Sequence, residues 1–389
     1  GLITITDGKW DIPWKTIFTA DFLAWLSCLA IIPIQLWAAT WKGMFASMGV
    51  GFAGLIAGMF VVKKSWWFIL PWSWGTRMMC PVLQLDPNGV MLEAGDPLLD
   101  ASVLPVGIIL SVVGFFVVTG LTALWFQMIS VLSSEWTKTK RTAIRWLIFL
   151  VPVLFSLAGV VYISMRSDLE EIYVFQGYFI AWAALVVPLA ISILAAFIVQ
   201  EEELAGNFTG YLSTSIPRRS LYAGKFWTLF LCNTVSTVIA LIVFCIGMSI
   251  ASPGTVNGWV MFIFAMILEL FGTLPLMALH LWLSFSWGTG ASIGIGMGGL
   301  VTAAIIGTTV LGDKVWMFIP WAWPFRLAKL PGAYLGFTAG MNMPPAEISS
   351  GAVLQQLIIG TAAVLICLIA CYVGGVIWFN KWEGRKHYE

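Results

Sequence analysis

Long apolar segments separated by short polar ones dominate the pattern of this chain. Nine segments have roughly the 20 apolar residues that a helix needs to cross a bilayer. They lie at 17–38, 44–62, 102–124, 146–165, 175–199, 227–250, 258–283, 291–311 and 353–379. Strict alternation of apolar and polar residues, typical of outer-membrane strands, is absent. The pattern therefore predicts an all-α polytopic membrane protein with about nine transmembrane helices, three followed by six.

Composition supports the same class of protein. Hydrophobic residues make up 60% of the 389 residues, charged residues 10%, and mean hydropathy is +0.92. Soluble domains carry about 25% charged residues, so a soluble fold is excluded. A net charge of +1 gives no case for a nucleic-acid partner. The six cysteines lie mostly in apolar runs and are interpreted as small core residues, with no metal site expected.

An internal repeat divides the chain. Residues 69–74 read ILPWSW and residues 318–323 read FIPWAW, 249 positions later. Upstream, ASMGVG at 46–51 matches ASIGIG at 291–296, 245 positions later. Such self-similarity indicates that residues 1–127, with about three spans, are a second version of the rear half of 128–389, which has six. The start at Gly1 rather than a methionine favours a chain whose front was lost.

Glycines also recur at a spacing of four, at Gly290, Gly294 and Gly298 and again at Gly54 and Gly58. Small residues at this spacing let helix backbones approach closely, so we interpret them as packing positions.

Met128 opens the segment MISVLSSEWTKTKRTAIRW, which has the pattern of a short amphipathic helix. Trp136 and Ile144 occupy its apolar positions. The polar positions carry Lys138, Lys140, Arg141 and Arg145. Such a segment can lie along cytoplasmic headgroups before the first span begins; an ordinary charged loop between helices is the alternative.

Basic residues set the orientation of 128–389. With its start inside, ten basic residues fall on the inner side: Lys138, Lys140, Arg141, Arg145, Arg218, Arg219, Lys225, Lys381, Arg385 and Lys386. Four fall outside: Arg166, Lys314, Arg326 and Lys329. The positive-inside rule therefore places the residue 128 region and the C-terminus in the cytoplasm. The first copy has the opposite bias, with Lys42 inside and five basic residues outside: Lys9, Lys15, Lys63, Lys64 and Arg77. We therefore take the orientation from the second copy.

The most informative polar stretch is EEELAGNFTGYLSTSIPRRSLYAGK at 201–225, between two spans on the inner side. Three glutamates end a span, a Gly-Asn pair follows, and Pro217 interrupts an amphipathic piece before the next span begins. At 25 residues the stretch is long for a connection in a helical bundle. It suits the presentation of a short helix to a cytoplasmic partner; a solvated anchoring loop is the alternative.

This stretch resembles the permeases of ABC-2-type transporters, most closely the lantibiotic-immunity (bacteriocin self-protection) branch. The resemblance rests on the glutamates, Gly-Asn, Leu-Ser, Ile-Pro-Arg-Arg and Gly-Lys of 201–225. The start MISVLSSEWTKTKRT, six spans in 128–389, and PWAWPFRL before the last span also fit. A tandem of one and a half permeases departs from the family, whose permeases are usually separate polypeptides.

The resemblance implies that the loop couples the permease to a separate cytoplasmic ABC ATPase dimer, which binds ATP and magnesium. A sister permease or a second copy of this chain would complete the membrane part. No cofactor and no enzymatic activity are expected in this chain, because Gly224-Lys225 is followed by Phe226 and no Walker A motif is present. The predicted coupling residues are Glu201, Glu202, Glu203, Gly206, Asn207, Pro217, Arg218, Arg219 and Lys225.

The PWSW and PWAW segments are predicted to lie on the outer side, as broken helical pieces at headgroup depth. One interpretation is a surface that grips an amphiphilic peptide at the outer leaflet; an aromatic belt facing lipid is the alternative. The candidate contact residues are Trp72, Trp74, Arg77, Trp321, Trp323 and Arg326.

Two polar residues fall inside one predicted span: Glu269 in mid-span and His280 near its inner end. A carboxylate at this depth is costly and usually faces protein or a wet cavity. A packing role is one interpretation, and a proton-coupling group is the other.

Together these patterns predict a multi-pass protein of the bacterial plasma membrane. Its expected function is that of a permease in an ATP-driven exporter giving resistance to a lantibiotic-type antimicrobial peptide. Three alternatives remain: export of another amphiphile (a drug or a lipid), a scaffold that binds peptide without transport, and a secondary transporter that uses Glu269.

Overall fold

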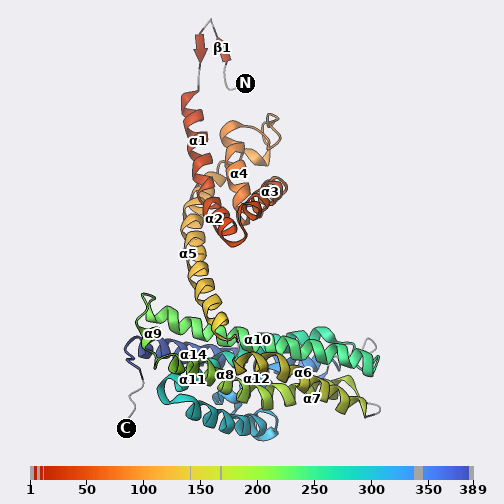
Figure 1. Cartoon of the computed structure of the whole chain (residues 1–389). Coiled ribbons are helices and arrows are strands. Elements are labelled where there is room, and N and C mark those ends of the chain that lie inside the picture. Colours follow the sequence, from red (N-terminus) through yellow and green to blue (C-terminus); the bar gives the residue numbers. More distant parts are fainter. Residues whose placement is uncertain are drawn as a thin grey trace. The chain divides into compact units, whose positions relative to one another are not determined.

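The computed structural model describes residues 4–6, 9–11, 13–140, 142–166, 169–336 and 345–384. The chain forms two compact units, Gly1–Met128 and Ile129–Glu389, and Figure 1 shows their elements. Arg141, Arg385 and Lys386, which entered the charge count, lie outside the described residues. The boundary coincides with the predicted one to within a residue; that 1–127 is half of a permease stays a prediction.

The first unit begins with a small antiparallel hairpin and continues as helices. Its elements are β1 (Thr4–Thr6), β2 (Lys9–Asp11), α1 (Trp14–Cys28), α2 (Ile31–Lys42), α3 (Met44–Val61), the 3-10 turn η1 (Trp67–Ile69), α4 (Pro71–Leu83) and η2 (Pro97–Leu99). Helix α5 (Val103–Lys138) is continuous across the unit boundary.

The second unit is a bundle of long apolar helices joined by short ones. Its helices are α6 (Ala143–Ser164), α7 (Glu171–Phe179), α8 (Val187–Leu204), α9 (Thr209–Leu212), α10 (Arg218–Ala251), α11 (Trp259–Thr302), α12 (Trp323–Ala328), α13 (Ala346–Ser349) and α14 (Ala352–Asn380). Two π-helices, η3 (Ile180–Val186) and η4 (Ala303–Gly307), and the 3-10 turns η5 (Val310–Gly312), η6 (Trp316–Phe318), η7 (Pro320–Ala322) and η8 (Leu330–Tyr334) complete it.

Aromatic side chains fill the core of this bundle. Tyr178 lies 4.3 Å from Phe244, and Phe175 lies 4.9 Å from Phe262, measured between ring centroids. Ser192 on α8 and Gly296 on α11 meet so closely that a Cβ at Gly296 would lie 2.1 Å from the Ser192 hydroxyl oxygen. The all-α polytopic fold class is thereby confirmed, apart from the terminal hairpin.

Eight helical stretches in the described residues are long and apolar enough to cross a membrane, against about nine predicted. The difference arises at 258–283 and 291–311, which count as one stretch, Trp259–Gly307, although the helix is broken between them. The chain turns back within it at Gly288, whose φ is 85°. His280 Nδ1 and the Ser292 hydroxyl are 3.1 Å apart, whereas 12 residues of straight helix would separate them by about 18 Å.

The first unit contains the same turn at the position that the repeat predicts. Gly43 has φ 85° and ψ −176°, and Gly288 has φ 85° and ψ −174°. The side chains of Gln35 and Ser47, 12 residues apart, meet across the Gly43 turn at 2.7 Å. Glycine accepts this positive φ without the steric cost that a side chain would bring, so the turn depends on glycine in both units.

The two aromatic segments also have matching packing. A Cβ on Gly54 would lie 2.2 Å from the Trp72 ring, and one on Gly299 would lie 2.0 Å from Trp321. Gly58, as predicted, is also a packing position against Trp72. Gly290, Gly294 and Gly298 are not, since a Cβ there would meet nothing within 4 Å in this chain.

Candidate functional site

Three segments meet at one end of the second unit: the last turns of α5, the loop 205–217, and the end of α14. The Phe208 ring lies 4.9 Å from Trp382, just past α14. Lys138 of α5 binds Glu202 of α8 at 2.6 Å. Figure 1 shows α9, which is part of this loop, beside the end of α14. The segments that the charge count places in the cytoplasm thus share one end of the bundle.

A cluster of two carboxylates and two ammonium groups lies beneath the loop. Lys225 forms ion pairs with Glu135 and, at 2.5 Å, with Glu202. Lys138 bridges the same two carboxylates, at 2.8 Å to Glu135 and 2.6 Å to Glu202. Lys225 is 1% exposed, and Glu135 and Glu202 are nearly as buried. Such a cluster is electrically neutral, and removing one member would leave a buried charge unpaired.

Interactions within and around the cluster shift the pKa values of Lys138 and Tyr211. Burial alone would lower the pKa of Lys138, but its hydrogen bonds to Glu135 and Glu202 outweigh burial and raise that pKa. Burial, followed by the negative charges of the same two glutamates, raises the pKa of Tyr211 well above its usual value. The ammonium groups of Lys138 and Lys225 each lie 5.3 Å from the centre of the Tyr211 ring, so this ring is held by cation–π contacts.

The loop leaves α8 by a sharp left-handed turn. Gly206, Asn207 and Phe208 have φ values of 129°, 48° and 64°. A bulky residue rarely adopts a positive φ, and here the Phe208 ring is buried against Phe285 and Trp382. The Tyr211 hydroxyl donates a hydrogen bond to the Leu221 carbonyl at 2.9 Å. Packing and hydrogen bonding therefore fix both sides of a short, exposed turn.

The predicted coupling residues divide into buried and exposed groups. Glu202 and Lys225 belong to the cluster, and Arg218 donates hydrogen bonds to the carbonyls of Asn380 and Trp382. Glu201 and Glu203 are half-buried. Gly206, Asn207, Pro217 and Arg219 are exposed. The exposed members are available to a partner, and the buried ones hold the loop in place; their part in coupling stays a prediction.

A groove of about 500 Å³ lies beside the loop. Its walls include Lys138, Glu202, Tyr211, Thr214 and Ile216. It offers a partner both apolar surface and the edge of the charge cluster.

Sequence reasoning missed Glu135 and misplaced Lys138. The pattern put Lys138 on a face toward lipid headgroups, but it is ion-paired within the protein. The spacing of Glu135 and Lys138, three residues on a helix, is a signal of an ion pair. Their pairing with Glu202 and Lys225 depends on tertiary contacts that spacing does not reveal. No group of three or more metal-binding side chains occurs among the described residues.

The predicted outer aromatic residues are largely inside the fold. Trp74 is 5% and Trp323 3% exposed, and their indole N–H groups donate to the carbonyls of Phe68 and Trp316. Arg77 donates to the carbonyls of Leu98 and Pro97. Trp72 and Trp321 are half-buried against glycines. This packing explains their position without a ligand, and their contact with a substrate stays a prediction.

Arg326 is 3% exposed and binds Asp313 at 2.6 Å and the carbonyls of Ile306 and Thr309 at 2.8 and 2.7 Å. It therefore fastens the segment after η4 to α12, and its donors are occupied.

The two intramembrane polar residues are both fully buried. Glu269 Oε1 lies 3.5 Å from the Thr237 hydroxyl, which also receives the Trp182 indole N–H at 3.4 Å. Glu269 Oε2 and His280 Nε2 have no hydrogen-bond partner among the described residues. His280 fastens the turn at Gly288 through Ser292, which gives it a structural role.

One comparison with known proteins gave a match. Residues 131–303, less than half of the chain, match the family model described as "ABC-2 family transporter protein". The matched range contains the loop, all four residues of the charge cluster, and both intramembrane polar residues. Searches of curated proteins and of solved structures found no match. Together with the eight apolar helices, the family match supports an ABC-2-type permease that crosses the membrane several times.

Proposed function

We propose that this chain is the transmembrane permease of an ATP-driven exporter that protects a bacterium against a lantibiotic-type peptide. The observation that carries the transport part is the loop 205–217, held on a buried, neutral four-charge cluster inside the family match. ABC-2 permeases work with a separate ATPase subunit, and a rigidly held exposed turn can transmit its motion. The peptide specificity rests on the resemblance of 201–225 to lantibiotic-immunity permeases.

In the proposed mechanism, closure of the cytoplasmic ATPase dimer pushes on the exposed turn. Because Glu202 and Lys225 link this turn to α5, α8 and α10, the push is delivered to three helices together. Repacking of these helices would then release peptide at the opposite end of the bundle. The second copy of the permease is either a sister chain or this same chain.

Retention of the cognate ATPase by the purified chain tests the coupling role. Leu204, 74% exposed beside the turn, is changed to Asp, and Leu311, 72% exposed and outside the coupling end, is changed to Asp as the matched control. We expect L204D to lose the ATPase and the protection of cells against peptide, while L311D keeps both. Equal retention by the two variants would contradict docking through this loop.

Further measurements separate the alternative functions. Protection that persists in cells without any ATPase would favour a peptide-binding scaffold. Transport that depends on the proton gradient and is lost in Glu269→Gln would favour a secondary transporter. Coupling to the ATPase with export of a different amphiphile would keep the transport proposal and replace only its substrate.

A further inference from the structure

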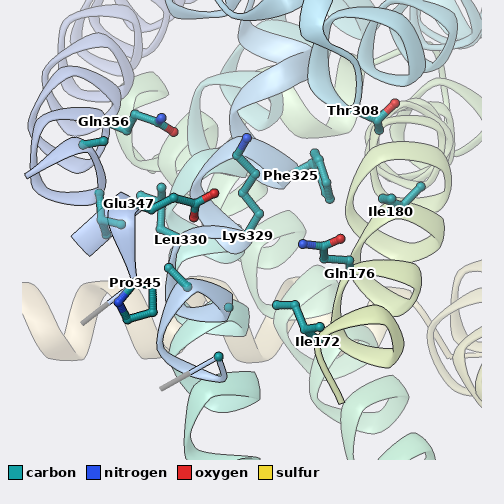
Figure 2. Close-up of a pocket in the computed structure, with 15 residues that line it drawn as sticks. Ile172, Gln176, Ile180, Thr308, Phe325, Lys329, Leu330, Pro345, Glu347 and Gln356 are labelled. Carbon is teal, nitrogen blue, oxygen red and sulfur yellow. The ribbon is translucent and has the colours of Figure 1, made fainter. Parts of the chain in front are cut away.

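A cavity of about 550 Å³ lies away from the coupling loop, at the other end of the second unit. Helix α10 starts at Arg218 beside the loop, and the chain that follows it reaches Gly258, whose N–H donates to Glu171 at the start of α7. The cavity wall begins at Ile172, the next residue. Figure 2 shows its lining side chains. The volume falls in the range of about 300–1,000 Å³ that is usual for small-ligand sites.

Both π-helices of the second unit border this cavity. Ile180 is the first residue of η3, and Thr308 directly follows η4; both line the cavity. The two π-helices pack against each other. Fewer than about 1% of residues in proteins lie in π-helices, and they occur frequently at functional sites. Two in contact at one cavity wall are therefore an observation independent of the cavity itself.

The cavity contains an ammonium group that has no ion pair within the part of the chain that the structure describes. Among the described residues, no carboxylate lies within ion-pair distance of Lys329, whereas the neighbouring Arg326 is bound to Asp313. Burial, followed by the positive charge of Arg326, lowers the pKa of Lys329. Figure 2 shows the Lys329 side chain lying between Gln356 and Glu347 on one side and Phe325 on the other. A half-buried cation of this kind gains most from an anionic ligand.

The remaining lining is amphiphilic. Ile172, Ile180, Phe325 and Leu330 supply apolar surface, and Gln176 supplies an amide. Gln356 and the exposed carboxylate of Glu347 lie on the side of α13 and α14. Amides and a carboxylate can pair with main-chain N–H and C=O groups, and Lys329 with a terminal carboxylate.

We propose that this cavity binds the C-terminal end of an amphiphilic peptide, with the peptide carboxylate on Lys329 and its apolar side chains on Ile172, Ile180 and Phe325. A peptide suits the site better than a phosphodiester lipid, because the main-chain N–H groups of a peptide can donate hydrogen bonds to Glu347, whereas a phosphodiester group only accepts them. That such a peptide is the transported substrate rests on the proposed function; the binding itself does not.

Binding to the full chain in nanodiscs of neutral phosphatidylcholine, without ATPase, tests the proposal. The probe is N-dansyl trileucine with a free C-terminal carboxylate, compared with its C-terminal amide by fluorescence anisotropy. Lys329→Gln removes the cation, and Lys329→Arg keeps it. Lys314→Gln is the matched control, because Lys314 lies in the same connection between spans, is exposed, and does not line the cavity.

We expect wild type to bind the carboxylate probe about tenfold more tightly than the amide, because only the carboxylate forms a charge-assisted hydrogen bond between two ions with Lys329. Lys329→Gln should abolish this preference, and Lys329→Arg and Lys314→Gln should keep it. Equal affinities for the two probes in wild type, no binding of either, or an unchanged preference in Lys329→Gln would overturn the proposal. Displacement of the probe by lysophosphatidylglycerol, at lower concentration than by unlabelled peptide and only with Lys329 present, would reassign the site to lipid.

These results are distinguishable from those of the coupling experiment. Loss of ATPase retention in Leu204→Asp concerns the other end of the bundle and leaves probe binding unchanged. Conversely, failure of the probe to distinguish carboxylate from amide leaves the coupling proposal standing.

Discussion

The rear half of the second unit and its counterpart in the first unit use the same turns to position different side chains. Gly43 and Gly288 have the same backbone conformation, and Trp72 and Trp321 pack on matching glycines. The groups at the functional positions differ. Where the second unit has the cavity lysine, Lys329, the repeat places the buried Cys80 in the first.

The comparison separates the backbone and packing features that both units share from the polar side chains that differ between them. A turn at glycine and a tryptophan against glycine are steric requirements, and both units satisfy them. The coupling loop with its charge cluster lies in the front half of the second unit, which the repeat does not duplicate. Both units therefore share these backbone features, whereas the proposed coupling loop and the proposed ligand site belong to the second. Each prediction below perturbs one unit and uses the other as its internal reference.

The largest effect is expected from Lys225→Met in the charge cluster. This change leaves Glu135 and Glu202 facing each other with only the half-exposed Lys138 between them. Breaking a buried ion pair in this way costs about 3–5 kcal/mol of unfolding free energy. The second unit should therefore open at a lower temperature, while the first unit is unaffected.

Buried cysteines report on each unit separately. Cys80 lies in the first unit and Cys232 in the second, and both are buried. In chains that retain only one of them, maleimide labelling against temperature measures the opening of that unit. Lys381→Met, which removes an exposed lysine at the same end of the bundle, should leave both curves in place. A shift of the Cys80 curve in Lys225→Met would show that the units do not respond separately.

The second prediction tests whether the shared turns carry equal strain. An alanine at φ 85° costs about 1–2 kcal/mol, so Gly43→Ala should advance labelling of Cys80 only, and Gly288→Ala labelling of Cys232 only. The two shifts should be similar because the backbone angles are the same. Gly49→Ala and Gly290→Ala are the controls, since a Cβ at either meets nothing within 4 Å. Unequal shifts would mean that two turns with the same backbone angles contribute differently to the stability of their units.

A third, smaller effect concerns the polar pairs that fasten the turns, Gln35 with Ser47 and His280 with Ser292. His280→Leu removes one buried hydrogen bond, worth about 1 kcal/mol, and should advance labelling of Cys232. His280→Gln installs the side chain that the first unit uses and should restore most of this loss. If His280→Gln were as destabilised as His280→Leu, the histidine would have a role beyond fastening the turn.

The fold class and the position of the unit boundary were accessible from sequence because they depend on local patterns, and the coupling role of the loop stays a prediction. Apolar runs of bilayer length identify spans, and the PWSW and PWAW repeat marks equivalent positions. The sequence predicts separate spans at 258–283 and 291–311, and the helix does break between them, at Gly288; the positive φ of this glycine was not accessible from the apolar pattern.

The charge cluster shows why the site was only partly predictable. Glu202 and Lys225 were candidates as members of one loop, but Glu135 and Lys138 lie 67 and 64 residues before Glu202, and 90 and 87 residues before Lys225. Their pairing arises from the packing of α5 against α8 and α10, which no sequence spacing encodes. The aromatic segments show a related limit: tryptophans that resemble an interface belt pack inside the fold, where Trp72 and Trp321 lie half-buried against Gly54 and Gly299.

The smallest effect concerns the proposed ligand site of the second unit, where Lys329 stands in place of Cys80 of the first. Burial and Arg326 lower the pKa of Lys329, and Asp313 and Glu347 oppose this from neighbouring segments. The lysine carries its charge below its pKa, and the probe is ionised above its carboxyl pKa of about 3.5, so the preference for the carboxylate probe should be full around neutral pH. It should fall as pH rises through that lowered pKa, before an ordinary lysine titrates near about 10.4. In Lys329→Arg the charge persists, and the preference should stay constant. A fall at the same pH in Lys329→Arg would assign the titration to another group, and the cavity lysine would no longer distinguish the second unit from the first.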